Sequence, residues 1–219
     1  MKLRIFCDFD GTVAQNDVGN LVFTTFGDED HWWKLVKEWE QGKLEGREMW
    51  RKQAAISRMT PSQLDEFAAT QAIDPTFPGF VEFCKTHRFP VYVVSDGMDA
   101  YISRILKHNG LDDLIVLSNH MDVSSTGILK VDFPYYENGC GSCANCKGLH
   151  VSKETKPGEV SIYIGDGYSD KCALAIADIT FAKDDLLLYC QEKNFPCRPY
   201  RNFEQVQKEL EELINDDQK

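Results

Sequence analysis

The sequence has no long run of apolar residues. No stretch approaches the roughly 18–20 apolar residues that a membrane-spanning helix needs, so we expect neither a transmembrane segment nor a membrane partner. The first eight residues already reach Asp8, before the apolar core of an export signal could form, and we therefore expect a cytoplasmic protein. With 42% apolar residues, the chain can still build a globular core.

Positive charge is also scarce. The chain holds 24 Lys and Arg against 35 Asp and Glu, for a formal net charge of −11. Proteins that bind nucleic acid or anionic membranes broadly present a basic surface, so this balance predicts no nucleic-acid partner. It does not exclude a small anionic ligand that is held by one local site.

The eight cysteines lack the paired C-x-x-C spacing that is typical of structural zinc sites. Cys140, Cys143 and Cys146 form a single run instead, with His150 nearby. Three alternatives stay open for this run: a structural metal with His150 as a possible fourth ligand, packing within a loop, or reversible disulfide formation. Four further cysteines are predicted to be small buried hydrophobes, namely Cys7, Cys84, Cys172 and Cys190.

Short apolar runs, often rich in β-branched residues, recur along the chain. Continuous rather than alternating apolarity is typical of strands that are buried on both faces, as in a parallel sheet. Helical patterns separate most of these runs, which predicts an α/β fold with a doubly wound parallel sheet. A hairpin at 121–133 and an amphipathic C-terminal helix complete the expected elements. The predicted strands are 3–7, 91–94, 114–117, 160–164 and 179–182.

The alternation of strands and helices breaks between residues 15 and 75. Trp32 and Leu35 begin one helical stripe, Met49 and Trp50 lie on a second, and Thr60 starts a third helix with a capping pattern. We therefore predict a small helical cap at 15–75, inserted after the first strand of a core that comprises 1–14 and 76–219.

Two carboxylates, Asp8 and Asp10, follow the first predicted strand. Residues two apart in extended backbone face the same side, and neighbouring carboxylates repel unless a cation neutralises them or one takes a proton. Because Mg²⁺ prefers oxygen ligands, the pair predicts a magnesium site, with an acidic turn as the alternative. Asp166, after the strand at 160–164, could complete this site. Asp170 could orient a ligand, assist the metal or cap the next helix.

Anion-binding groups follow the strand at 91–94. The Ser95 hydroxyl and the Gly97 backbone N–H can both donate hydrogen bonds to a phosphoryl oxygen, and Asp96 lies between them. Lys147 could supply a positive charge to an anionic substrate or to crowded carboxylates. Each feature also has a plainer interpretation, as a turn, a helix cap or a solvated lysine.

The order of these motifs carries more information than any one of them. An Asp-x-Asp-Gly-Thr motif, a serine after a strand, a lysine and a Gly-Asp-Gly-x-x-Asp motif together resemble the haloacid dehalogenase superfamily over nearly the whole chain. The second acid, Asp10, favours the phosphatases of that superfamily. The helical insertion is similar to the small cap of the phosphoserine phosphatase-like branch.

Within this branch, two segments are similar to the methionine-salvage phosphatases that act on 2-hydroxy-3-keto-5-methylthiopentenyl-1-phosphate. They are Ser95–Asp99 and the Cys-x-x-Cys-Lys run that ends at Lys147. The Ser-Asp pair and the cysteine–lysine run are also similar to phosphoethanolamine/phosphocholine phosphatases. A substrate-binding arginine of phosphoserine phosphatases falls on Gln53 here, and a neutral amide pairs poorly with a carboxylate.

The resemblance implies a Mg²⁺-dependent hydrolase of a small phosphorylated metabolite, acting as a monomer or homodimer. Asp8 would be the nucleophile that forms an aspartyl-phosphate, and Asp10 the general acid and base. Alternatives are a phosphoserine or phosphoamine-headgroup phosphatase, and a non-catalytic binding module on the same fold. The resemblance further implies that Asp8, the Asp10 backbone carbonyl and Asp166 bind Mg²⁺, with assistance from Asp170. It implies that the phosphate is bound by Ser95, Asp96, Gly97 and Lys147. Substrate specificity would come from Met98 and from the cap residues Asp17, Arg47, Trp50, Arg51 and Gln53.

Overall fold

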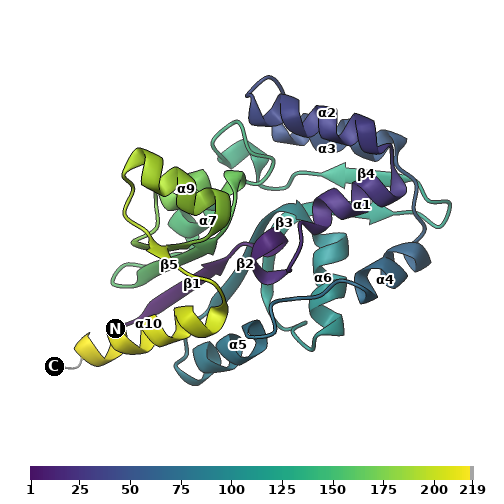
Figure 1. Cartoon of the computed structure of the whole chain (residues 1–219). Helices are drawn as coiled ribbons and strands as arrows, with labels where there is room; N and C mark the ends of the chain where they lie inside the picture. Colours follow the sequence, from purple (N-terminus) through teal and green to yellow (C-terminus); the bar gives the residue numbers. More distant parts are fainter. Residues whose placement is uncertain (218–219) are drawn as a thin grey trace.

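A computed structural model describes residues 1–217 of the chain. Within this part, seven strands form one sheet in the order β4-β3-β2-β1-β5-β6-β7 (Figure 1). All neighbouring strands are parallel except β3 and β4, which are antiparallel. The predicted doubly wound α/β fold is confirmed. The strands are β1 (Leu3–Cys7), β2 (Val91–Met98), β3 (Ile115–Val123), β4 (Leu129–Asp132), β5 (Val160–Gly165), β6 (Ile179–Ala182) and β7 (Arg198–Pro199).

The central strand β1 is buried along its whole length because helices cover both faces of the sheet. Successive side chains of a strand point to opposite faces, so Ile5 and Phe6 enter two different hydrophobic cores. The first core includes residues of α5 (Phe77–Thr86), α6 (Asp99–His108) and α10 (Phe203–Asp217), and the second includes residues of α7 (Lys147–Glu154) and α8 (Lys171–Leu174). Helix α9 (Asp184–Lys193) packs beside β6.

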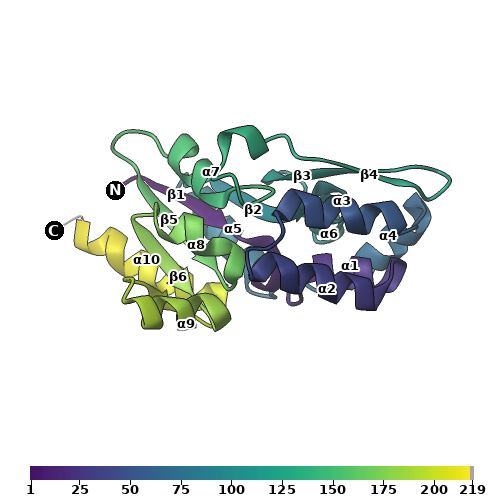
Figure 2. The ribbon, with the colours of Figure 1, turned by 90° about the horizontal axis from the view of Figure 1, so that it is seen from above.

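Four helices lie between β1 and α5, where the helical cap is predicted: α1 (Val18–Phe26), α2 (Glu29–Glu40), α3 (Gly46–Ile56) and α4 (Pro61–Ala69). Figures 1 and 2 show α1, α2 and α3 grouped on one side of the molecule. The stacked rings of Phe23 and Trp32, with centroids 5.3 Å apart, hold α1 to α2. The sequence pattern does not predict α1, because its valines, threonines and phenylalanines suit a strand as well as a helix. The limits of a separate cap domain stay a prediction.

Strand β3 is longer than predicted. It continues past Leu117 and runs directly into the predicted hairpin, where it pairs with β4 across a turn at Gly127. The hairpin reaches the helical segment, since the Met59 N–H donates to the Gly127 carbonyl at 3.2 Å and α3 packs on β4. The β3–β4 hairpin, at the edge of the sheet away from β1, therefore packs against the helical segment.

None of the helices in the described residues combines the length and apolar character needed to cross a membrane.

Candidate active site

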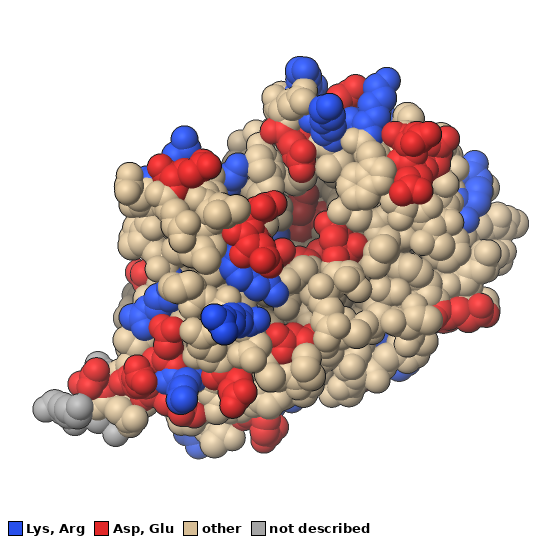
Figure 3. All heavy atoms as spheres, in the orientation of Figure 1, with Lys and Arg blue, Asp and Glu red and all other residues tan. Residues whose placement is uncertain are grey.

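A hollow lies where the carboxyl ends of β1, β2 and β5 meet the helical segment, as expected for ligand sites in open α/β sheets. Its volume is about 280 Å³. Figure 3 shows Asp and Glu side chains in and around it. The sheet side contributes polar groups and the helical side mostly apolar ones. The polar lining includes Asp8, Asp10, Ser95, Lys147 and Asp166, and the helical lining includes Trp32, Trp33, Val36, Trp39, Met49 and Trp50.

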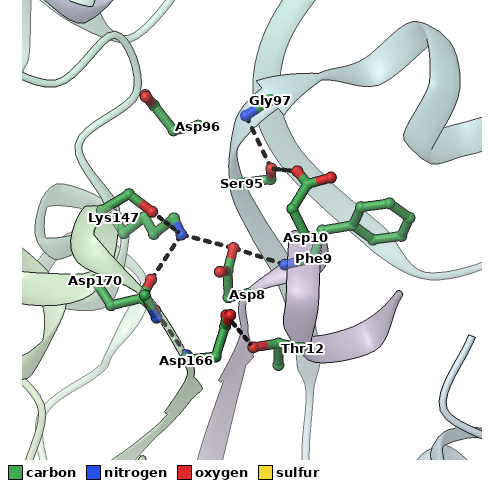
Figure 4. Close-up of polar contacts among 12 residues, drawn as sticks. Asp8, Phe9, Asp10, Thr12, Ser95, Asp96, Gly97, Lys147, Asp166 and Asp170 are labelled. Carbon is green, nitrogen blue, oxygen red and sulfur yellow. Dashed lines mark hydrogen bonds and ion pairs between the residues drawn. The ribbon is translucent and has the colours of Figure 1, made fainter. Parts of the chain in front are cut away.

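The ammonium of Lys147 lies between two carboxylates at the floor of this hollow (Figure 4). Its Nζ is 2.6 Å from Oδ1 of Asp8 and 2.6 Å from Oδ1 of Asp170, and it donates to Ser169 Oγ at 2.7 Å. Burial alone would lower the pKa of Lys147, but the charges of Asp170 and Asp8 outweigh it and raise that pKa. The lysine therefore stays charged and holds the Asp8 carboxylate in place.

Asp170 is fully buried, and four donors satisfy its carboxylate. Oδ1 accepts from Lys147 and, at 2.5 Å, from the Tyr163 hydroxyl, and Oδ2 accepts from the backbone N–H groups of Asp166 and Gly167. A carboxylate with this many partners has no lone pair readily available for a metal or substrate. We infer that Asp170 positions Lys147 and the Asp166 loop, which favours the orienting role among its predicted alternatives.

Three carboxylates crowd together at this point. One oxygen each of Asp8, Asp166 and Asp170 lies within 4.8 Å of the other two. Burial, followed by the charge of Asp170, raises the pKa of Asp8 well above its usual range and that of Asp166 to about 6. Lys147 alone does not balance the negative charge of the three carboxylates. Since Asp170 is saturated, Asp8 and Asp166 are the members that fit a cation that prefers oxygen ligands, such as Mg²⁺.

Two neighbours fix the orientation of Asp166. The Thr12 hydroxyl donates to Asp166 Oδ1 at 2.8 Å. Gly11 has a φ of +74°, and a Cβ at this position would collide with the Asp166 carboxylate. Gly11 thus leaves room for the Asp166 carboxylate and Thr12 binds it. The Gly-Thr part of the first motif therefore helps to hold Asp166, which follows β5, beside Asp8, which follows β1.

The Asp10 carboxylate stands apart from that cluster. Oδ1 accepts from the backbone N–H groups of Val18 and Gly19, while Oδ2 accepts from the Ser95 and Tyr101 hydroxyls, each at 3.3 Å. Burial, followed by the charge of Asp17, raises the pKa of Asp10 to about 7. A group with that pKa is suited to giving and taking a proton at neutral pH. The predicted metal contact through the Asp10 backbone carbonyl stays a prediction.

The segment after Val94 behaves as a preformed turn. The Gly97 N–H donates to Ser95 Oγ at 2.9 Å, so both predicted phosphate donors face the Asp10 carboxylate (Figure 4). Asp96 points away from Asp8, and its Oδ1 accepts from the Asn145 N–H at 2.6 Å. Its side chain therefore anchors the loop that precedes Lys147, and only its backbone is left for the predicted binding of an anion.

Asn145 is an important residue that no sequence motif singles out. Its Nδ2 donates to the carbonyls of Ser95 and Leu117, both at 2.8 Å, and its Oδ1 lies 2.6 Å from Nε2 of His150. Asn145 thus connects β2 and β3 to the loop that carries Lys147. The group of cysteine sulfurs that lie within 4.8 Å of one another does not include His150, so the interpretation of His150 as a metal ligand is not supported.

The family model described as Putative Phosphatase matches residues 3–212 of the chain. The chain belongs to this family. It is 30% identical over 220 residues to 2-hydroxy-3-keto-5-methylthiopentenyl-1-phosphate phosphatase of Geobacillus thermodenitrificans, with 97% of each chain covered. The protein of that name from Bacillus cytotoxicus is 29% identical, with 98% of each chain covered. These findings confirm the resemblance inferred from the motifs: the chain is a phosphatase of the haloacid dehalogenase type.

Solved structures show the same fold. A phospho-aspartyl intermediate analogue of phosphoserine phosphatase superposes with a TM-score of 0.71 at 23% identity, covering 94% of this chain and 98% of the other. A substrate-bound phosphoserine phosphatase complex gives a TM-score of 0.72 at 22% identity, covering 95% and 98%. At these identities the likeness establishes the shared fold alone.

In this Putative Phosphatase family member, only two of the predicted specificity residues line the hollow, namely Asp17 and Trp50. The Arg47 guanidinium lies 3.7 Å from the centroid of the Tyr136 ring, and that of Arg51 lies 5.1 Å from the centroid of the Phe133 ring. Both arginines leave α3 on a face that does not reach the hollow. For these two residues, the structure does not support the predicted role in specificity.

Gln53 and Met98 are also turned away from the hollow. Gln53 is fully buried within the helical segment, where its amide donates to the Phe23 and Asp28 carbonyls. Met98 is fully buried at the start of α6. The structure does not support a specificity role for either. Residues that line the hollow without having been predicted to do so include Asn20, Trp39 and Tyr168.

The close approach of Gly97 to its neighbours gives a test of this part of the phosphatase site. A Cβ at Gly97 would overlap the Tyr101 hydroxyl and lie 2.9 Å from Asp10 Oδ2. We expect Gly97→Ala to displace Asp10 and lower kcat by about 100-fold, the scale that a misplacement of about 1 Å produces. Phosphate release and circular dichroism measure activity and folding.

Gly167→Ala is the matched control, because a Cβ at Gly167 meets no atom within 4 Å. It should keep most of the activity. Wild-type kcat in Gly97→Ala would show that the turn tolerates a side chain and that Tyr101 does not constrain Asp10.

Proposed function

We propose that this phosphatase hydrolyses a small phosphomonoester through a phosphoaspartate at Asp8, with Mg²⁺ as its cofactor. The observation that carries the proposal is the placement of Asp8, buried at the floor of the hollow between the Lys147 ammonium and the Asp166 carboxylate, with Asp10 held to one side. Asp8, the Asp10 backbone carbonyl and Asp166 would hold the ion. Mg²⁺ supplies charge that lets an anionic phosphoryl group approach a carboxylate.

In the first step, an oxygen of Asp8 attacks phosphorus as the bond from phosphorus to the leaving oxygen breaks. Asp10, whose pKa of about 7 leaves it substantially protonated near neutrality, gives its proton to that oxygen. Ser95, Gly97 and Lys147 stabilise the phosphoryl oxygens through donated hydrogen bonds and charge. In the second step, Asp10 takes a proton from water, which attacks phosphorus, releases phosphate and regenerates Asp8.

The hollow favours a substrate with an apolar tail. Trp32, Trp39 and Met49 contribute to its helical side, and thioethers make favourable contacts with aromatic rings. Among the described residues that line the hollow, Lys147 is the only Lys or Arg, and two carboxylates already engage it. The carboxylate of phosphoserine would therefore lack a cationic partner. We propose 2-hydroxy-3-keto-5-methylthiopentenyl-1-phosphate as the substrate, which the relatives' names support.

A specific observation favours a second candidate, a phosphoamine such as phosphocholine or phosphoethanolamine. Asp17 lines the hollow together with the tryptophan rings. Carboxylates and aromatic faces are the groups that bind a quaternary or primary ammonium. The two candidates differ in whether substrate binding needs the Asp17 charge. A phosphoamine would pair with it, whereas a methylthio tail gains nothing from it.

A substrate panel separates these candidates. Phosphate release would be measured with Mg²⁺ for the methylthiopentenyl ester, phosphocholine, phosphoethanolamine, phosphoserine and an aryl phosphate. We expect the methylthiopentenyl ester to have the highest kcat/KM. Trp39→Ala should lower that value by about 10- to 200-fold, the worth of a lost apolar contact. Phe195→Ala, at an exposed aromatic residue outside the hollow, is the control.

Asp17→Asn gives the decisive comparison. It should leave kcat/KM for the methylthiopentenyl ester within a few-fold of wild type, whereas a phosphoamine enzyme would lose most of its activity on the amine. Turnover of phosphocholine above that of the methylthiopentenyl ester would replace the first candidate by the second.

A further inference from the structure

Four cysteine side chains from two separate segments meet beside the active site. Cys140, Cys143 and Cys146 lie in the loop before α7, and Cys172 lies at the start of α8. The Sγ atoms of Cys140, Cys146 and Cys172 all lie within 4.8 Å of one another. Cys143 lies between Cys140 and Cys146 in the same loop and lines a hollow together with Cys140 and Cys172. The loop run thus acquires a fourth cysteine that its sequence spacing does not reveal.

This cluster corrects the expectation for Cys172. It is not a deeply buried hydrophobe like Cys7 or Cys84 but a half-buried member of the thiol group. With Cys172 as the fourth sulfur, the site needs no ligand from His150, which lies outside the group. All eight cysteines are free, so no disulfide holds the cluster together.

The dimensions match those of a tetrahedral thiolate site. Zn–S bonds of about 2.3 Å in a tetrahedron place the sulfur atoms about 3.8 Å apart. The observed limit of 4.8 Å for three of the sulfurs is within small side-chain rotations of that value. Cys143 lines the same hollow as Cys140 and Cys172, so a rotation of its side chain would bring a fourth sulfur to the group.

Backbone donors lie within the loop as well. The Cys143 N–H donates to Cys140 Sγ at 3.5 Å, and the Leu149 N–H donates to the Cys146 carbonyl at 3.1 Å. Donors to sulfur, such as the Cys143 N–H, orient thiolate ligands and stabilise their charge.

We propose that Cys140, Cys143, Cys146 and Cys172 bind one Zn²⁺ ion in a structural four-thiolate site. Each thiol that binds releases its proton to solvent. A second hollow, lined by Cys140, Cys143 and Cys172 and about 640 Å³ in volume, gives the ion a path from solvent. Thiolate ligands favour Zn²⁺ over Mg²⁺, so the two metals would occupy different sites.

The position of the cluster indicates what such an ion would do. Cys146 directly precedes Lys147, and Cys172 follows Asp170 by two residues. An ion that joins these cysteines would fix the two segments whose side chains form the Lys147–Asp170 ion pair. The same loop contacts the helical segment, where the Gly46 N–H donates to the Ser142 carbonyl at 3.1 Å.

The test uses the full chain without a histidine tag, purified under reducing conditions. Metal analysis should find one Zn²⁺ per chain. Titration of the metal-free protein with Co²⁺ should produce sulfur-to-cobalt charge-transfer absorption that saturates at one equivalent, a band that carboxylate-bound Co²⁺ in the phosphatase site lacks. Cys172→Ser should weaken Zn²⁺ binding by at least about 100-fold, the upper range for loss of a metal-supporting group.

Cys197→Ser is the matched control, because Cys197 is also half-buried but lies near Cys190, outside the cluster. It should bind Zn²⁺ like the wild type. The proposal is overturned if wild-type protein with eight titratable thiols shows no sulfur-to-cobalt band, or if Cys172→Ser and wild type bind Zn²⁺ equally. A disulfide within the cluster of freshly purified protein, found by mass spectrometry in place of bound Zn²⁺, would equally overturn it.

Discussion

Asp8→Asn is expected to abolish phosphate release, with kcat falling by about 10⁵-fold or more, as happens when an enzyme loses its nucleophile. An amide oxygen is a poor nucleophile towards phosphorus, and the neighbouring Asp170 cannot take the place of Asp8 because four donors saturate its carboxylate. The fold should survive. The raised pKa of Asp8 means that its ionised form costs stability at neutral pH, and a neutral amide removes that cost.

The measurement is phosphate release from the best substrate of the panel, together with a thermal unfolding scan. Asp112→Asn, an exposed substitution far from the hollow, controls for the change of charge. We expect the Tm of Asp8→Asn to equal or exceed that of the wild type when Mg²⁺ is absent. Substantial residual turnover in Asp8→Asn would exclude a phosphoaspartate at this residue and favour direct attack by water.

Lys147→Ala is expected to remove both activity and stability. Lys147 is 1% exposed and is the cation that two buried carboxylates share. Removing one partner of a buried ion pair typically costs about 3–5 kcal/mol, because the remaining charge stays buried without compensation. For a chain of this length, that loss corresponds to a fall in Tm of about 10 °C. Urea unfolding and phosphate release measure the two effects.

A second substitution separates these effects. Adding Asp170→Asn to Lys147→Ala removes one of the two uncompensated carboxylates, so the double variant should regain part of the unfolding free energy but none of the activity. Lys107→Ala, at an exposed lysine of α6, is the control and should change neither. If Lys147→Ala unfolds like the wild type, the ammonium does not balance Asp8 and Asp170 in the folded protein.

The sheet side of the site could be predicted from the sequence because topology does most of the assembly. Asp8, Ser95 and Asp166 each follow a continuous apolar run, and such runs form parallel strands whose carboxyl ends meet at one edge. The observed order places β1 between β2 and β5, so these three residues become neighbours. The positions of the motifs and the adjacency of the strands were sufficient to predict that these three residues lie together.

The helical side could not be predicted in the same way. Periodicity shows which residues share a helix face, but it does not show what that face will meet. Gln53 therefore turned out to be buried inside the segment, and Arg47 covers Tyr136 instead of the hollow. Asn145 and Cys172 escaped prediction because their partners are distant in sequence, at Ser95 and Leu117 and in the cysteine loop.

The central place of β1 in the sheet has a consequence for folding during synthesis. Ile5 pairs with Val91 on one side and with Ile162 on the other, so β1 is fully paired only after both β2 and β5 have been synthesised. Pairings between residues so far apart slow folding and leave strand edges exposed meanwhile. Asp8 follows this strand directly, and its backbone N–H donates to the Ile164 carbonyl of β5. During synthesis Asp8 therefore emerges well before β5, and it cannot be fixed in place until β5 has also left the ribosome.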